Sequence, residues 1–520
     1  MELFTCSILI SCALVSLLYV WKFLNWVWFT PKSLENHLRR QGFAGNPYRL
    51  MTGDLKESAA IIKNAENQSM EFTNDIVSRV YPIFHTAFKN HGKKSFVWFG
   101  PRPALILSDP EAVRDILMKN YIFVKMPNSP LNKMLGRGLV MLEQDEWTKH
   151  RKLINPAFHV QKLKNMVGSF HMSCSIMMRK WDELARIDGS IELDVWPYLQ
   201  AMTADVVSRA AFGISNDEGE KIARLQKQQA ACILQANRSL YIPGWRYLPT
   251  KGNRRLKQLT EEIESIFRSI ISKRMEEEAG REEEEAGGRE EGDLLGILLE
   301  SNSKEMKEHG AKSGLNMKDV MEECKNFFFA GQDTSAALLS WTMILLSKNQ
   351  DWQTRARDEV LQAFGTRKPD YQELNHLKIL GMILHEVLRL YPPIVMLARH
   401  TEKEGASGKV TIPAGVQLML PVLLLHHDPE IWGPDAKEFN PERFAQGVSG
   451  ATGGRLTYLP FGWGPRTCIA QNFALLQTKM TMATMLQNYS FRLSPSYLHA
   501  PLTVVSLQPQ HGARLILTKI

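Results

Sequence analysis

One cysteine, Cys468, follows a short turn that contains Gly462 and Gly464, and a helical pattern over residues 469–487 begins just after it. The two glycines permit a tight turn in which backbone N–H groups come close to the sulfur. The N-terminal dipole of the helix acts on the same atom, so both features are expected to lower the pKa of the thiol. A lone cysteine after a loop is more often a buried free thiol. This arrangement instead predicts a thiolate ligand for haem iron.

Two more side chains near the turn suit the same chemistry. Arg466 stands two residues before the sulfur, where its guanidinium can meet a haem propionate. Phe461 can pack over the ligand and shield it from water. With Phe461, Gly464 and Arg466 at these offsets, a purely structural role for Cys468 becomes the less favoured interpretation.

The run FGWGPRTCIA at residues 461–470 resembles the signature of the cytochrome P450 family, F-x-x-G-x-R-x-C-x-G. One position departs from it, because Ala470 stands where the family usually has glycine. We expect this methyl group to shift haem packing slightly without preventing binding. The resemblance covers nearly the whole chain. It implies haem b as cofactor and a mainly helical fold with two lobes, a large helical lobe and a minor β-sheet lobe.

A second motif, AGQDTS at residues 330–335, lies in an apolar pattern over 317–346 that is long enough for one central helix. By itself it is a weak signal, and a solvated polar turn is the commoner interpretation. Its position upstream of Cys468 matches the family's oxygen-activation motif. The resemblance implies that Thr334 relays or holds protons and that Asp333 organises their delivery. Gly331 is expected to leave room for dioxygen and to let the helix bend.

A third pattern places Glu386 and Arg389 one helical turn apart, where they can pair. Such pairs are common on helix surfaces and usually mean little. Downstream, however, the run NPERF at residues 440–444 matches another element of the family. The resemblance implies that Arg443 joins Glu386 and Arg389 in a buried structural triad.

A fourth pattern, Trp147 followed by Arg151, is either a tryptophan–arginine stack on a plain surface or part of a binding site. In the family both side chains reach haem propionates. Arg399, which follows the run YPP at residues 391–393, is a further predicted propionate contact.

The chain begins with a stretch over residues 3–21 that has no charged residue and, as a helix, is about 28 Å long, close to the thickness of a bilayer core. A cleaved signal peptide is the rival interpretation, but it needs a basic start and a shorter apolar core. Lysines and arginines follow the stretch while Glu2 precedes it, so the positive-inside rule places the bulk of the chain in the cytosol. We therefore predict an anchor over residues 1–30, a linker over 31–60 and a catalytic domain over 61–520. The predicted location is the endoplasmic reticulum membrane, with a single span.

Charge and cysteine content narrow the class of protein further. The net charge is +8, but we find no concentrated basic stripe, so nucleic-acid binding is not predicted. The charge better suits anionic lipid headgroups and an acidic partner protein. The six cysteines show no pairing pattern, which favours a reducing compartment.

Strand patterns predict a minor sheet near the substrate. Residues 95–99 and 104–108 are expected to form one hairpin, and residues 409–412 and 417–420 another. The aromatic, proline-containing loop at 241–249 is either an ordinary buried loop or a segment that dips into the membrane interface.

Several details, among them the run QGFAGNPYRL at residues 41–50, resemble the plant family numbered seventy-two. The resemblance implies a monooxygenase that uses dioxygen and takes electrons from NADPH through a separate reductase. It also implies a lipophilic terpenoid-type substrate of the triterpenoid or steroid, gibberellin or iridoid class. Substrate contacts are expected from residues 126–139, 394–397 and 504–507 and from the helix just before Gly331.

Two rival functions stay open at this point. A haem-thiolate isomerase or dehydratase needs no external electrons, and the Asp333–Thr334 pair argues against it. A haem-binding sensor or interaction protein would keep Cys468 but has no need of that pair. The sequence leaves undecided the exact substrate, the carbon attacked and the extent of oxidation.

Overall fold

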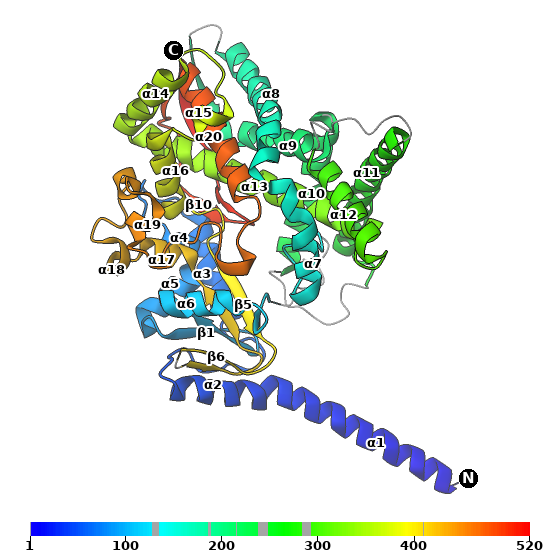
Figure 1. Cartoon of the computed structure of the whole chain (residues 1–520). Helices are drawn as coiled ribbons and strands as arrows, with labels where there is room; N and C mark the ends of the chain where they lie inside the picture. The colour runs from blue at the N-terminus through cyan, green and yellow to red at the C-terminus, as the bar shows by residue number, and fades with distance from the viewer. Residues whose placement is uncertain are drawn as a thin grey trace. The chain divides into compact units, whose positions relative to one another are not determined.

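The computed structural model describes residues 2–126, 135–185, 189–214, 216–237, 248–282, 293–408 and 410–520. The chain forms two compact units. Figure 1 shows its helices and strands, coloured by residue number. Unit 1 comprises Met1–Gln68, Asp75–Met126 and Met396–Leu425. Unit 2 comprises Ser69–Asn74, Pro127–Val395 and His426–Ile520.

Unit 1 contains the N-terminal helices and a mixed sheet. Its helical elements are α1 (Glu2–Leu24), η1 (Asn25–Phe29), α2 (Thr30–Arg40), α3 (Leu55–Asn67), α4 (Val77–Val80), α5 (Pro82–His91) and α6 (Pro110–Met118). Its strands are β1 (Ser95–Phe99), β2 (Arg102–Ile106), β3 (Phe123–Val124), β5 (Leu397–Thr401), β6 (Gly405–Ser407), β7 (Val410–Ile412) and β8 (Gln417–Leu420). Five of these strands make one sheet in the order β1-β2-β8-β5-β3.

The predicted hairpin of β1 and β2 is confirmed, although its second strand begins two residues earlier than expected. Pro103, expected in the turn, lies in β2 opposite Trp98. The parallel pairing of β2 with β8 starts only at Ala104, so the missing N–H of the proline is not needed by that neighbour.

The second predicted hairpin is wrong. The strand β7 pairs with β6, whereas β8 pairs with β2 and β5, so the two segments join different sheets. Residue 409 lies outside the described residues. The turn between the strands wraps around Thr401, whose hydroxyl donates to the carbonyl of Pro413 at 2.7 Å and whose carbonyl accepts from the N–H of Gly415 at 2.9 Å. These contacts direct the chain away from its own preceding strand.

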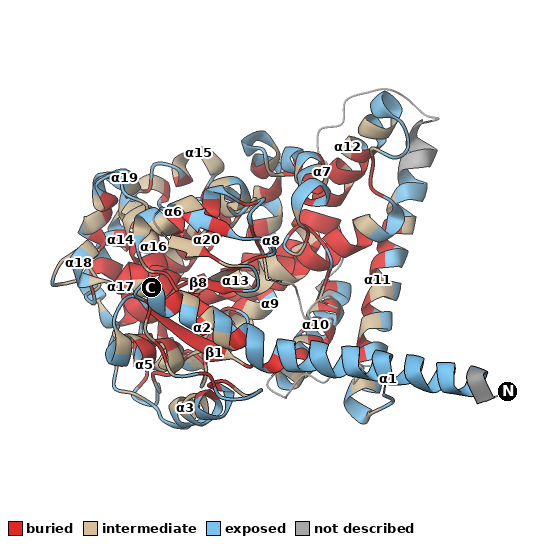
Figure 2. Ribbon diagram, turned by 90° about the horizontal axis from the view of Figure 1, so that it is seen from below, coloured by how far each residue is buried: buried red, intermediate tan, exposed pale blue. Residues whose placement is uncertain are grey.

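The N-terminal helix is long and apolar. It runs without interruption from α1 through the π-helical turn η1 into α2. Residues 4–24, which form most of α1, are exposed (Figure 2). Its length and composition make it a candidate membrane span, with a mean hydropathy of 2.0 over the most apolar window. Trp26, Trp28 and Phe29 lie in η1.

Unit 2 is mostly helical. Its longer helices are α7 (Gln144–Ile154), α8 (Val160–Leu184), α9 (Val195–Phe212), α10 (Asn216–Asn237), α11 (Lys251–Glu282), α12 (Leu294–His309), α13 (Met317–Lys348), α14 (Gln350–Phe364), α16 (Lys378–Leu390) and α20 (Gln471–Asn488). Its shorter helical elements are η3 (Asn155–Phe158), α15 (Tyr371–Leu374), α18 (Pro429–Trp432), η5 (Pro441–Phe444), α19 (Gly447–Thr452) and η6 (Gly464–Arg466), while α17 (Val422–His427) crosses from unit 1. Its strands are β4 (Ser190–Asp194), β9 (Tyr489–Leu493), β10 (Pro501–Thr503), β11 (Leu507–Pro509) and β12 (Arg514–Lys519).

The core of unit 2 is built around α13, the single helix expected over residues 317–346. A capping box starts it, in which the Asn316 side chain accepts from the N–H of Asp319 at 3.0 Å and the Asp319 carboxylate accepts from the N–H of Asn316 at 3.2 Å. Its 32 residues extend over about 48 Å. It contacts α9, α10, α11, α14, α16, α20 and the strands β9 and β11.

The predicted fold class is confirmed, because helices dominate and the sheets are small. The boundaries proposed for anchor, linker and catalytic domain stay predictions. Residues 127–134, within the predicted substrate stretch 126–139, lie outside the described residues, as does most of the aromatic loop at 241–249.

Candidate active site

The turn before Cys468 has the geometry that its glycines predict. Gly462 and Gly464 have φ angles of 73° and 71°, which side chains with a Cβ rarely adopt. The N–H of Gly462 donates to the carbonyl of Leu459 at 3.0 Å, and the N–H of Cys468 donates to the carbonyl of Phe461 at 2.9 Å. These bonds close the loop on both sides of Phe461, so the position of the cysteine is set by the backbone.

Cys468 is exposed by its accessible surface, although neighbouring protein atoms crowd its sulfur. This desolvation raises the pKa of the thiol, while the N–H of Ala470 and the charge of Arg151 act in the opposite direction. The direction for the thiol without metal is therefore opposite to the expected one, and the lowering expected for a metal-bound thiolate stays a prediction. A metal cation at the sulfur adds the charge that deprotonates a coordinating thiol.

The helix α7 lies against the cysteine loop and brings two predicted residues to it. The guanidinium of Arg466 lies 4.5 Å from the centre of the Trp147 ring, and Arg151 donates to the carbonyl of Thr467 at 2.9 Å. The tryptophan thus stacks on Arg466 and not on Arg151. Both contacts fasten α7 to the segment that carries the ligand.

Arg466 also has a carboxylate partner that the sequence did not indicate. Its guanidinium donates to the carbonyl of Leu142 at 2.5 Å and forms an ion pair with Glu143, the residue before α7. The motif pointed only to a propionate for this arginine. No spacing rule marks Glu143, because it lies more than 300 residues away in the chain.

Arg399 lies on β5 of unit 1, where it is buried and donates to the carbonyl of Ala398 at 2.9 Å. Its role as a propionate contact stays a prediction.

A short stretch of α13 differs from the rest of that helix. Residues 329–334 are half-buried, although Phe328 before them and Ser335 after them are fully buried. Since α13 is otherwise mostly buried from Val320 onward, this partial exposure means that solvent-accessible space reaches the stretch. Asp333 and Thr334 both belong to it.

The two polar side chains of this stretch take different partners. Asp333 accepts a hydrogen bond of 2.5 Å from the hydroxyl of Ser506, and burial raises the pKa of its carboxyl group. Thr334 donates to the carbonyl of Ala330, one turn back in its own helix, at 2.7 Å. Bonds of the second kind leave a hydroxyl group beside the helix and can bend the helix.

Gly331 lies where α13 packs closely on α9. The helix continues unbroken through it, and a Cβ at this position would lie 3.1 Å from a methyl group of Val207 on α9. Close packing of the two helices is thus one reason for glycine here. The expected room for dioxygen and the expected bend stay predictions.

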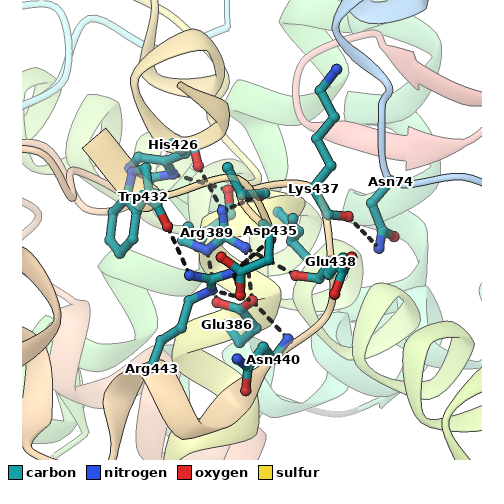
Figure 3. A network of polar contacts seen from close by, with 12 residues as sticks. Asn74, Glu386, Arg389, His426, Trp432, Asp435, Lys437, Glu438, Asn440 and Arg443 are labelled. Atoms are coloured by element: carbon teal, nitrogen blue, oxygen red, sulfur yellow. Dashed lines mark hydrogen bonds and ion pairs between the residues drawn. The ribbon is translucent and has the colours of Figure 1, made fainter. Parts of the chain in front are cut away.

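The three residues of the predicted triad lie together in unit 2 (Figure 3). Arg389 makes two bonds of 2.7 Å to the carboxylate of Glu386, and both side chains are fully buried. Arg443 lies 3.5 Å from the same carboxylate. Its closer partner is Asp435 at 2.5 Å, so the triad is part of a wider network that the motifs did not reveal.

A histidine connects this network to the cysteine loop. Nδ1 of His426 donates to the carbonyl of Arg389 at 3.1 Å, and Nε2 accepts from the N–H of Leu459 at 2.8 Å. Burial lowers the pKa of His426 to about 3, so the ring is neutral and can donate at one nitrogen and accept at the other. Leu459 in turn accepts the bond from Gly462 that begins the turn. Nothing in the local sequence distinguishes this histidine from its neighbour His427.

This geometry fits haem. Cys468 has a thiol beside an N–H and an arginine charge that would support a thiolate, and two arginines and a tryptophan lie around the same loop. Asp333 and Thr334 add a buried acid and a hydroxyl group on the central helix. The fold and this set of residues together define a haem-thiolate oxygenase.

Comparison with known proteins gives the family. A sequence model of the family described as cytochrome P450 matches residues 75–512. Cytochrome P450 CYP72A219 of Panax ginseng is 53% identical over 520 residues, covering 99% of each chain. Cytochrome P450 72A15 of Arabidopsis thaliana is 50% identical over 523 residues, covering all of both chains. Secologanin synthase 2 of Catharanthus roseus is 47% identical over 506 residues, covering 96% of this chain and 95% of the relative.

The chain belongs to the cytochrome P450 family, and its relatives of the 72A group place it among plant enzymes. It is a monooxygenase of that family, which implies haem, a redox partner and dioxygen.

Proposed function

We propose that this chain is an endoplasmic reticulum monooxygenase that oxidises a lipophilic terpenoid-type substrate with dioxygen and electrons that a reductase takes from NADPH. The observation that carries the proposal is the half-buried stretch of α13, which presents Asp333 and Thr334 in the core of the unit that holds Cys468. A haem-thiolate isomerase or a sensor has no use for an acid and a hydroxyl group there.

The proposed roles follow from the contacts. When bound, haem supplies the iron at which dioxygen is reduced and from which one oxygen atom passes to a C–H bond. Cys468 would hold the iron, while Trp147, Arg151 and Arg466 would hold the propionates. Arg466 would exchange its bond to Glu143 for a propionate, because both are carboxylates and a guanidinium binds either.

Two other groups of this chain would manage protons. Asp333 keeps its proton to a higher pH than an exposed aspartic acid, since burial disfavours the carboxylate. This direction suits the role of a proton donor. The Thr334 hydroxyl, held by Ala330, can accept one hydrogen bond while it donates another.

Glu386, Arg389 and Arg443 act at a distance from the chemistry. We propose that they hold the segment 435–440 and, through His426, the backbone at Leu459 that precedes the ligand turn. Their function is to keep the loop in the shape that receives haem.

The N-terminal helix supports the proposed location. As a single membrane span, it would leave the rest of the chain in the cytosol, because the basic residues follow it. The reductase and the lipophilic substrate are then available at the same membrane surface. The secologanin synthase named among the relatives and the resemblance to the seventy-two family both favour a terpenoid-type skeleton.

The test is product formation from a panel of terpenoids by microsomes that contain this chain and a plant reductase, with and without NADPH. We expect a product heavier by one oxygen atom that requires NADPH. A product formed equally without NADPH would favour the isomerase or dehydratase. A protein that shows the thiolate spectrum of the reduced carbon-monoxide complex but yields no product from any terpenoid would contradict the substrate class.

A further inference from the structure

The tip of the hairpin formed by β10 and β11 reaches α13 at the acid. Ser506 is the residue before β11 and is fully buried. Its hydroxyl donates to Oδ2 of Asp333 at 2.5 Å, and its backbone N–H gives the same carboxyl group a second hydrogen bond. The acid therefore takes two bonds from one residue that is 173 positions away in sequence.

A second contact fixes the hairpin on the same helix. The indole N–H of Trp341 donates to the carbonyl of Leu507 at 2.8 Å, and the N–H of Leu507 donates to the carbonyl of Pro393 at 2.9 Å. Trp341 lies eight residues after Asp333 on α13, which is about 12 Å along the helix axis. Because Leu507 adjoins Ser506 and is fully buried, Ser506 cannot leave Asp333 without disturbing these bonds.

A charge also acts on Asp333. Lys227 on α10 favours the carboxylate form from a distance. The ammonium group of Lys227 donates to Gln200 at 3.2 Å and not to Asp333. Ser506 thus makes the close contacts, whereas Lys227 supplies only long-range electrostatics. A donor of fixed position beside a buried acid determines both where the acid points and how readily it gives up its proton.

We propose that Ser506 is a positioning residue that holds the carboxyl group of Asp333 at the wall of the reaction space for proton delivery. The inference rests on the proposed function, in which Asp333 is the acid. It assigns the tip of the C-terminal hairpin a part in the reaction besides contact with substrate.

The test compares Ser506→Ala with Thr503→Val. Thr503 lies on the same hairpin, and its buried hydroxyl has no hydrogen-bond partner among the residues that the structure describes, so its removal controls for packing. The carbon-monoxide spectrum should be unchanged in both variants, and product per NADPH is measured at saturating substrate so that any change in substrate affinity is separated from coupling. In Ser506→Ala, we expect product formed per NADPH to fall about tenfold, with more peroxide released, because a hydrogen bond to a charged group is lost.

A second measurement does not depend on turnover. The infrared band of the protonated Asp333 carboxyl group is identified by its loss in Asp333→Asn and is followed against pH. Loss of the serine hydroxyl disfavours the carboxylate, so the band of Ser506→Ala should persist to higher pH than in the parent protein. Ser506→Cys keeps the shape with a weaker donor and should lie between the two, which maintains the test if the alanine variant does not fold.

The outcomes separate the two levels of the proposal. If Asp333→Asn loses coupling while Ser506→Ala and Ser506→Cys keep the parent's coupling and band, the role of Ser506 is overturned and the proposed function stands. If Asp333→Asn itself stays fully coupled, the proposed role of the acid fails, and the inference fails with it. Equal losses in Thr503→Val and Ser506→Ala would assign the effect to packing and also overturn the inference.

Discussion

The cysteine loop and the half-buried stretch of α13, residues 329–334, differ in how many contacts hold them. Backbone bonds, two residues of α7 and the network through His426 all fix the loop around Cys468. By contrast, among the described residues the close side-chain contact of Asp333 is Ser506, and Thr334 is bonded to its own helix. The proposed metal ligand is therefore held by many contacts, whereas the groups proposed to handle protons can rearrange when one or two bonds are lost. Changes in the cysteine loop are therefore predicted to cause loss of haem, whereas changes in residues 329–334 of α13 are predicted to lower the product formed per NADPH.

The largest effect is expected from Cys468→Ser. The hydroxyl group keeps the loop bonds but cannot supply a thiolate, so the thiolate signature of the reduced carbon-monoxide complex should disappear together with activity. Circular dichroism should show that the helices persist. Survival of the signature would reject Cys468 as the ligand.

Glu386→Ala should be next in size. It strands the buried guanidinium of Arg389, which costs about 3–5 kcal/mol of stability, and we expect haem-free protein. The measurement is haem content per folded protein at low expression temperature. Glu442→Ala is the control, because Glu442 lies in the same NPERF run but pairs at the surface with Arg355. Normal haem content in Glu386→Ala would contradict the structural role.

Thr334→Ala should leave haem and substrate binding intact and reduce product formation by about a hundredfold, the scale at which general acid and base groups act. NADPH should still be consumed and peroxide released. The matched control is Thr342→Ala, in which a buried threonine of the same helix with the same bond to the residue four positions back is changed. Full coupling in Thr334→Ala would remove Thr334 from the proton pathway.

Acid should weaken the cysteine loop through His426. Its pKa in the folded protein is lowered by burial to about 3, so the unfolded chain binds the proton first as pH falls below about 6.5. The stabilisation is complete above that pH and is lost progressively toward pH 3. We expect faster loss of the thiolate signature at pH 5 than at pH 7, and a smaller difference between these pH values in His426→Gln. An unchanged pH dependence in that variant would assign acid sensitivity to other groups.

The smallest effect is expected for Gly331→Ala. Alanine favours the helix by about 1 kcal/mol, but its methyl group crowds Val207 at 3.1 Å, so the two terms nearly cancel. The temperature of thermal unfolding should therefore change little in Gly331→Ala. In the double variant with Val207→Ala, it should fall more, because the packing of Val207 on α13 is lost. A large loss of product per NADPH without a change in unfolding temperature would support the prediction that Gly331 makes room for dioxygen.

Local patterns predicted what depends on nearby residues. The bounds of α13, the β1–β2 hairpin and the turn before Cys468 all follow from caps, alternation and glycine conformation, which act over a few residues. The pairing of β7 with β6 could not be predicted in this way, because strand partners are chosen by the whole sheet.

Long-range partners account for the features that the sequence analysis missed. Glu143 beside Arg466, His426 beside Leu459 and Ser506 beside Asp333 are ordinary residues at unremarkable spacings. The direction of the pKa shift of the Cys468 thiol without metal was also missed, because desolvation by neighbouring atoms depends on the fold and not on the motif.

The N-terminal helix has a fixed rotation relative to unit 1. The hydroxyl of Tyr48 donates to the carbonyl of Val27 at 2.7 Å, and the rings of Trp28 and Tyr48 lie 6.2 Å apart. One residue inserted before Val27 would turn every earlier side chain by about 100° about the helix axis. Because its rotation is tied to the rest of unit 1, this helix as a membrane span would determine which face of unit 1 meets the lipid.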